Sequence, residues 1–288
     1  MSGSDTATPA GLPQVSRGIG IALGSTTALS AILFYFGWSR AYYFYDYFGV
    51  DSSLLGLTTR DYLQLSVDGL FVPLTVAAAI ALAALWAWPV LRRAASARWS
   101  RLAGAVAGVL LLLNGLSAIV VRTPANRLLV AAPICLAAGA GLLVSALRAA
   151  RRPAVVGRAV TEWSVLLVLV GVSLFWAAND YSAAVGRSRA REMAAQLPAF
   201  PDATLFSEKS LSLRNPGVRE VRCADEEAAF AFRYDGLKLI LQSGDVYLLL
   251  PGAWTATTGT AVVLPRTDTT RLEFRPSGAA PVPPAATC

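Results

Sequence analysis

The chain contains no histidine, only two lysines and three cysteines, and charged residues make up just 15% of its 288 residues. The absence of histidine excludes His-ligated metal and haem sites, Ser-His-Asp and Cys-His catalysis, and pH sensing by imidazole. A soluble domain carries roughly 25% charged residues. The low charge, together with 55% hydrophobic residues and a mean hydropathy of +0.52, predicts an integral membrane protein.

Five apolar runs in the first 180 residues are long enough to cross a bilayer, whose hydrocarbon core of about 30 Å takes roughly 20 helical residues. They are Ile19 to Trp38, Leu70 to Leu91, Leu102 to Val121, Leu128 to Leu147 and Val160 to Ala178. Five buried core helices in this stretch would need a larger soluble protein. We therefore expect an α-helical integral membrane protein with five transmembrane helices in residues 17–180, after a disordered tail in residues 1–16.

The net charge of +7 would suit a nucleic-acid binder, but the positions of the arginines favour a membrane topology. Eight of them lie in two short, acid-free connections between predicted spans. These are Arg92, Arg93, Arg98, Arg101, Arg148, Arg151, Arg152 and Arg158. Short cytoplasmic loops collect arginine, so we expect a plasma-membrane protein with a cytoplasmic N-terminus and an extracytoplasmic C-terminal domain.

The same two arginine clusters are expected to contact anionic headgroups at the cytoplasmic face. They lie against a bilayer in short loops, and we therefore predict no nucleic-acid partner. The ratio of 23 arginines to two lysines is typical of GC-rich coding, which favours a high-GC bacterium as the source.

The first outer connection is rich in aromatic residues, which favour the headgroup layer and predict an interfacial belt that extends the first helix to about Phe48. Thr58 and Asp61 have the spacing of a capping box, which predicts a helix start near Thr59. Asp61 and Asp68 lie about two turns apart on that helix. They form either a cation-attracting vestibule at the outer mouth or a pair of solvated interfacial acids.

Small residues in the predicted spans indicate close helix packing. Gly20 and Gly24 form one GxxxG pair, Gly104 and Gly108 form another, and Gly115 continues the face of the second pair. Asn114 is a strongly polar side chain near the middle of the third span. We expect it to hydrogen-bond to a neighbouring helix.

Residues 181–275 have a different composition and predict a small antiparallel β-rich domain outside the membrane, followed by a Pro/Ala-rich tail in residues 276–288. A short amphipathic helix is expected at residues 187–197, before Pro198. Alternating runs then predict up to eight strands, in residues 204–207, 211–214, 218–222, 229–234, 237–242, 246–250, 260–264 and 270–275. Asp235-Gly236 between two such runs predicts a hairpin, and Asn215-Pro216-Gly217 and Ser243-Gly244 predict further turns. One face of this sheet is free to remain solvated.

The cysteines divide by position. Cys135 lies within a predicted span and is expected to pack there, whereas Cys223 and Cys288 both lie in the predicted outer region, where a disulfide between them would persist. No nucleophile and base, metal-ligand set or cofactor motif stands out, so we predict no catalytic residues, no metal and no cofactor.

These features favour a non-enzymatic multi-pass membrane protein of the cell envelope. Its extracytoplasmic β domain would bind a partner or ligand in an accessory, scaffold or sensor role, with a protein partner or self-association. A homo-oligomeric ion channel or pore is the alternative, because of the glycine seams and the Asp61 and Asp68 face. A membrane enzyme that uses carboxylates is a minor alternative.

Overall fold

The computed structural model describes residues 12–67, 75, 78–79, 82–83, 85–86, 98–120, 128, 130–150, 156–224 and 228–278. Its main helices are α1 (Leu12–Asp46), α3 (Arg98–Val120), α4 (Ala131–Ala150) and α5 (Val156–Gln196). Short 3-10 helices follow α1 and α5, namely η1 (Ser52–Leu55) and η3 (Leu197–Ala199). Residues 59–67 are also helical.

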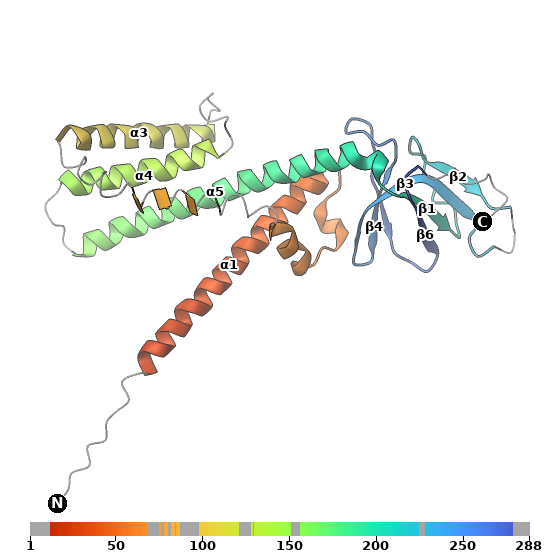
Figure 1. Ribbon diagram of the computed structural model, residues 1–288, viewed down its shortest axis with the longest axis horizontal. Helices are drawn as coiled ribbons and strands as arrows, with labels where there is room; N and C mark the ends of the chain where they lie inside the picture. Colours follow the sequence, from red (N-terminus) through yellow and green to blue (C-terminus); the bar gives the residue numbers. More distant parts are fainter. Residues whose placement is uncertain are drawn as a thin grey trace, which may run out of the picture.

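The helices divide into two groups along the molecule. In Figure 1, α3, α4 and the first half of α5 lie side by side at one end, while the second half of α5 reaches the sheet and crosses α1. α5 is one helix of 41 residues. The amphipathic segment predicted at residues 187–197 is therefore the C-terminal end of this helix, and Pro198 lies in the 3-10 turn that follows it.

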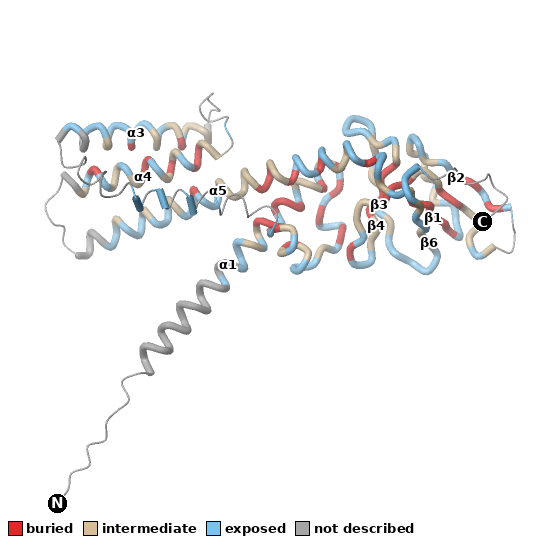
Figure 2. The backbone as a smooth tube through the Cα atoms, viewed as in Figure 1, coloured by how far each residue is buried: buried red, intermediate tan, exposed pale blue. Residues whose placement is uncertain are grey.

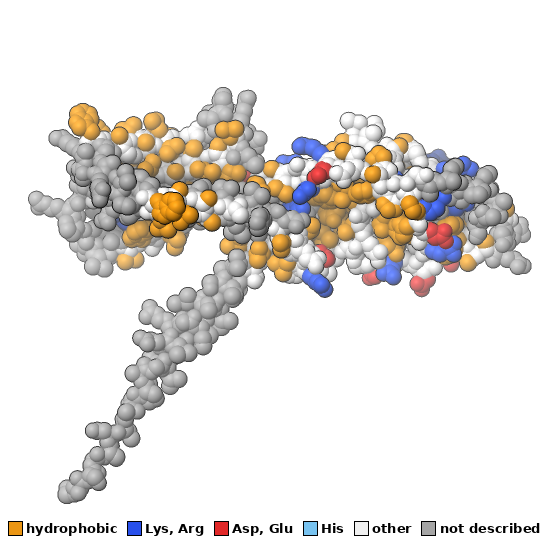
Figure 3. Space-filling view, viewed as in Figure 1, with side chains coloured by type: hydrophobic (Ala, Val, Ile, Leu, Met, Phe, Trp, Pro, Cys, Tyr) orange, Lys and Arg blue, Asp and Glu red, His pale blue; other side chains and the backbone are white. Residues whose placement is uncertain are grey.

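Two helices are long and apolar enough to cross a membrane, Ala131–Arg148 and Val160–Ala199, and Leu102–Ala118 is a shorter apolar helix. Only 6% of the apolar 18-residue stretch of Val160–Ala199 is buried within the chain. Figure 3 shows hydrophobic side chains spread over the α3, α4 and α5 end, whereas charged side chains gather over the other end. The prediction of five spans is thus matched by two helices, and residues 70–91 lie largely outside the described residues.

The C-terminal part is a six-stranded antiparallel sheet. Its strands are β1 (Asp202–Ser207), β2 (Arg219–Arg222), β3 (Phe232–Ser243), β4 (Val246–Pro251), β5 (Val262–Pro265) and β6 (Thr270–Arg275). Their order is β5-β4-β3-β1-β6, and β2 pairs with the first part of β3. The predicted antiparallel sheet is confirmed.

The hairpin predicted at Asp235-Gly236 is wrong, because β3 runs without interruption through both residues. Gly236 has a φ of +88°, and a Cβ there would lie 2.1 Å from the main-chain oxygen of Gly217. Gly236 therefore allows two backbone segments to lie close together, and it does not mark a chain reversal. The chain does reverse at Gly244, between β3 and β4, where Ser243 pairs with Val246. Residues 211–214, predicted as a strand, are irregular.

The sheet is buried on both faces along β4. Leu248, Leu249 and Leu250 are all completely buried, although successive side chains of a strand point to opposite faces. Leu249 packs in the core of the sheet itself, whereas Leu248 and Leu250 pack against residues of α1 and α5. Figure 2 shows buried segments of the sheet in red near the ends of α1 and α5. The expectation that one face could remain solvated is wrong here, because the helices cover it.

Candidate functional site

The sheet stands on a helical base that we call the stem, formed by residues 34–67 and 179–200. Within it, Gly186 of α5 lies against α1, and a Cβ at Gly186 would be 2.6 Å from a main-chain oxygen of α1. Polar side chains join the same two helices. The Oδ1 atom of Asn179 accepts a hydrogen bond of 3.2 Å from the Ser39 hydroxyl, which in turn accepts one of 2.7 Å from Ser182. Close backbones and buried hydrogen bonds thus fix the angle between α1 and α5.

The helical segment 59–67 completes the stem and begins at the predicted capping box. The main-chain N–H and the hydroxyl of Thr58 each donate to Oδ2 of Asp61 over 2.8 Å. These hydrogen bonds, from the backbone first, lower the pKa of the Asp61 carboxyl. The segment is also tied to α1, because the Arg40 guanidinium donates to the main-chain oxygen of Leu65. Asp61 therefore has a structural role as a helix cap, and Asp68 lies outside the described residues.

A second polar link fastens the sheet to the end of α5. Lys238 of β3 is only 5% exposed, and its ammonium donates to the main-chain oxygen of Phe200 over 2.5 Å. The same ammonium lies 2.8 Å from a carboxylate oxygen of Asp202. Both contacts offset the cost of burying the ammonium. The hydrogen bond from Lys238 to Phe200 joins the sheet to the stem, whereas the ion pair with Asp202 joins β3 to β1.

A pocket of about 450 Å³ opens where the stem meets the sheet, and we call it the junction pocket. Its volume falls within the range of about 300–1,000 Å³ that is typical of small-molecule sites. It is lined by α1, segment 59–67, α5, the residue after η3, and β3. The lining residues are Arg40, Ala41, Phe44, Tyr45, Leu65, Arg189, Glu192, Met193, Gln196, Phe200 and Ile240.

No protein-family model, curated protein or solved structure matches this chain. The residues of the chain itself are therefore the basis for a functional assignment. The junction pocket is the feature with the clearest chemistry, because charged, hydroxyl and apolar side chains from distant parts of the sequence converge in it.

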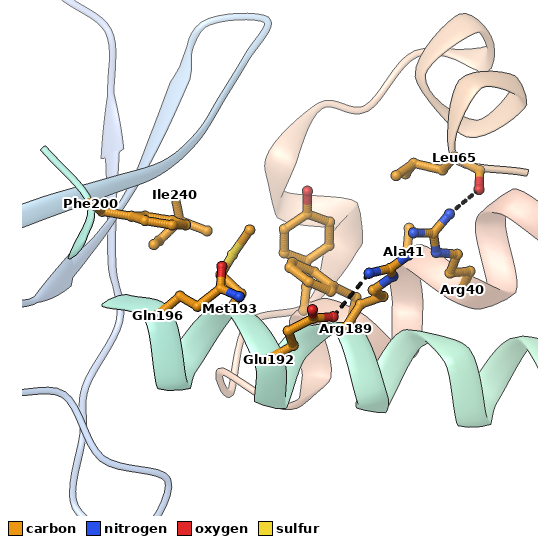
Figure 4. A pocket seen from close by; sticks show the side chains of 11 residues that line it. Arg40, Ala41, Leu65, Arg189, Glu192, Met193, Gln196, Phe200 and Ile240 are labelled. Carbon is orange, nitrogen blue, oxygen red and sulfur yellow. Dashed lines mark hydrogen bonds and ion pairs between the residues drawn. The ribbon is translucent and has the colours of Figure 1, made fainter. Parts of the chain in front are cut away.

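The junction pocket is chemically divided. Figure 4 shows Arg40, Arg189 and Glu192 at one end, beside Ala41 and Leu65, and Phe200 and Ile240 at the other, with Met193 and Gln196 between them. Arg40 is only 7% exposed. Arg189 and Glu192 form an ion pair of 2.9 Å, with both side chains about half exposed.

Tyr45 lines both the junction pocket and a neighbouring pocket that Asp61 also lines. Burial, with a smaller effect from the Asp61 carboxylate, raises its pKa to about 12. The Tyr45 hydroxyl therefore remains protonated at neutral pH and is able to donate a hydrogen bond.

The predicted glycine seam is used partly between α3 and α4. A Cβ at Gly108 would lie 2.9 Å from the main-chain nitrogen of Leu143, and one at Gly115 would lie 3.0 Å from the main-chain oxygen of Ala132. Asn114 between them donates to the sulfur of Cys135 in α4 over 3.4 Å. Gly104, in contrast, has open space where its Cβ would be, so it takes no part in this seam. The contacts of Gly20 and Gly24 in α1 lie outside the description.

Among the arginines predicted to meet lipid headgroups, Arg148 has a described side chain. It lies 3.4 Å from a carboxylate oxygen of Glu162 and stacks over the ring of Trp163 at 4.2 Å, so it contacts α5 of the same chain. The others lie in parts of the chain whose side chains are not described. They are Arg92, Arg93, Arg98, Arg101, Arg151, Arg152 and Arg158.

The cysteines separate as their positions suggested. Cys135 is a free thiol in α4, whereas Cys223, directly after β2, is disulfide-bonded. Cys288 lies outside the described residues, so the pairing of Cys223 with Cys288 stays a prediction. Within the described residues no group of three or more acidic or cysteine side chains is placed to hold a metal ion.

Sequence reasoning did not find the junction pocket. Its charged residues Arg40 and Arg189 are 149 positions apart in the sequence. Two local features of the sequence pointed toward the pocket. Arg40 lies just after the aromatic end of the first predicted span, and Arg187, Arg189 and Arg191 are closely spaced on one predicted helix. Neither feature reveals that β3 closes the same space.

Proposed function

We propose that this chain is a non-enzymatic, multi-pass membrane protein of the cell envelope whose sheet domain and stem bind a ligand or partner outside the membrane. The observation that carries the proposal is the junction pocket. It lies between the sheet and the stem, beyond the apolar helices, and its lining combines charged and apolar groups, as ligand sites do.

The membrane part of the proposal follows from the exposed apolar helices. Only 6% of the apolar stretch of Val160–Ala199 is buried within the chain. In water, this helix would expose a large apolar surface. A bilayer covers such a surface. We extend this placement to all five predicted spans, with the N-terminus inside and the sheet outside.

The contacts between sheet and stem favour a sensor or accessory role. Leu248 and Leu250 fasten β4 to α1 and α5, and α5 continues from there into its apolar stretch. A ligand that changes how the sheet sits on the stem would therefore act directly on a predicted transmembrane helix. The channel alternative gains nothing from Gly108 and Gly115, because these residues pack against α4 of the same chain.

Site-specific photo-crosslinking in intact cells tests the proposal. A photoreactive residue is placed at Gln196, on the rim of the junction pocket, or at Phe274, which is 54% exposed on edge strand β6. The matched control is Leu167, which is 74% exposed in the apolar part of α5. We expect a discrete adduct from Gln196 or Phe274 that is absent from Leu167. No adduct from either position, in a protein present at the normal level, would contradict the proposal.

A further inference from the structure

The junction pocket has a charged end and an apolar end, which restricts the ligands that fit it. Arg40, Arg189 and Glu192 lie at one end and Phe200 and Ile240 at the other (Figure 4). A sugar or a free inorganic ion would leave the apolar end unfilled, and a hydrocarbon would bring no oxygen atom to the guanidinium groups of the charged end. A ligand that matches both ends carries a charge at one end and an apolar body at the other.

The charge at this end favours an anion. Two guanidinium groups and one carboxylate line it, which gives this end a net charge of +1. A guanidinium binds carboxylate and phosphate oxygens through paired N–H donors. The hydrogen bond to the Leu65 main-chain oxygen holds the Arg40 side chain in a defined position, which lowers the cost of ordering it on binding.

The ion pair between Arg189 and Glu192 does not prevent this. Both side chains are about half exposed, and an exposed pair of this kind contributes little to stability. Arg189 is therefore able to contact a ligand oxygen at small cost. Gln196 lines the same pocket, and its side-chain amide is a further hydrogen-bond donor.

We propose that the junction pocket binds a single-chain anionic amphiphile. Its carboxylate or phosphate lies at Arg40 and Arg189, and its apolar chain extends between Met193, Phe200 and Ile240. This inference rests on the proposed function, since it names the chemistry of the ligand. The anion has two possible sources, a free acid in solution and a single-chain phospholipid that leaves the bilayer beside the pocket.

The test uses the full-length protein in nanodiscs and a photoreactive decanoic acid, with the labelled peptides identified by mass spectrometry. We expect labelling enriched in the peptides that contain Met193 to Phe200 or Ile240, and competition by decanoate. Decanol, which has the same chain without the charge, is expected to compete at least about tenfold more weakly. Equal competition by decanol, or labelling spread evenly over the apolar helices, would overturn the inference.

Variants separate the charged end from the general surface charge. Arg189→Gln should weaken competition by decanoate about tenfold, because one charge-assisted hydrogen bond is lost. Arg191→Gln removes the same charge two residues away, outside the pocket lining, and should leave competition unchanged. Gln196→Trp should block labelling, because the larger side chain fills the rim of the pocket. Arg40→Lys keeps the positive charge and tests whether the buried guanidinium itself is needed. Equal effects of Arg189→Gln and Arg191→Gln would also overturn the inference.

Two further arms identify the source of the ligand and isolate the inference from the proposed function. If lysophosphatidylglycerol competes at lower concentration than decanoate, the pocket takes a membrane-derived anion, and the reverse order indicates a soluble acid. If the decanoic acid probe fails while adducts from Gln196 or Phe274 persist in cells, the inference is wrong and the proposed function stands. If those adducts are absent as well, both are wrong.

Discussion

The contact between α1 and segment 59–67 predicts a large effect for a small substitution, Gly37→Ala. A Cβ at Gly37 would lie 1.8 Å from the main-chain oxygen of Tyr62, whereas an ordinary contact at this position is 3.4–4 Å. The two backbones would have to separate by at least about 1.6 Å, the difference between 3.4 and 1.8 Å. Main-chain atoms cannot turn aside as a flexible side chain can, so the segment as a whole must move.

The cost of this movement follows from what holds the segment in place. Overpacking of this kind costs roughly 3 kcal/mol. The edge-to-face pair of Phe34 and Tyr62, now 5.3 Å apart, would lose about 1 kcal/mol more. Replacing glycine by alanine in a helix returns about 1 kcal/mol. The net loss for Gly37→Ala is therefore about 3 kcal/mol.

The matched control is Gly171→Ala in α5, where a Cβ would meet nothing within 4 Å. It makes the same chemical change without the clash and should leave stability unchanged or slightly raised. Stability is measured on the full-length protein in detergent as the temperature at which the monodisperse fraction falls by half. At about 2–4 °C per kcal/mol, Gly37→Ala should lower this temperature by about 6–12 °C. A Gly37→Ala protein as stable as the wild type, or a Gly171→Ala protein equally destabilised, would refute this packing argument.

Three further predictions concern topology, capping and the disulfide. An alkaline phosphatase fused to the C-terminus should be active in cells, because the sheet is proposed to lie outside, and an inactive fusion made in normal amounts would contradict the topology. Thr58→Ala should destabilise the protein by about 1 kcal/mol through loss of the helix cap. Because the pKa of Asp61 is lowered on folding, chiefly by the main-chain N–H of Thr58, the Asp61 carboxylate contributes stability above the ordinary carboxyl pKa and loses it as the pH falls through the lowered one, so stability curves of wild type and Asp61→Asn against pH should converge in acid. Curves that remain parallel would show that Asp61 is not the titrating group. In a non-reducing gel, Cys288→Ser should migrate like the reduced wild-type protein if it pairs with Cys223, and unchanged migration would argue against that pair.

Local patterns were sufficient to predict several elements. The alternation in β6 gave its bounds, 270–275, and the Thr58 and Asp61 spacing placed the start of a helix at residue 59. Both depend on contacts within a few residues. The same kind of pattern failed at Gly236, because its positive φ serves the approach of Gly217, a contact that no local sequence rule describes.

The docking of the sheet on the stem also escaped prediction for a physical reason. Leu248, Leu249 and Leu250 form a continuous apolar run, which indicates a strand buried on both faces but does not identify the covering element. The covering residues come from α1 and α5, some 200 and 50 positions earlier. The junction pocket arises from this docking, and so its lining could not be assembled from the sequence alone.

The unbroken course of α5 has a mechanical consequence. A helix of 41 residues measures about 60 Å from end to end, and it contains no proline at which it would kink. α1 contacts its C-terminal half at Gly186 and Asn179, while its N-terminal half packs beside α4. If α5 tilts by 5° about its contact with α1, the roughly 45 Å of straight helix between Gly186 and Val156 moves the far end by about 4 Å. A small rotation of α5 beside the sheet is therefore enlarged into a shift of most of a helical turn at the end that packs beside α4.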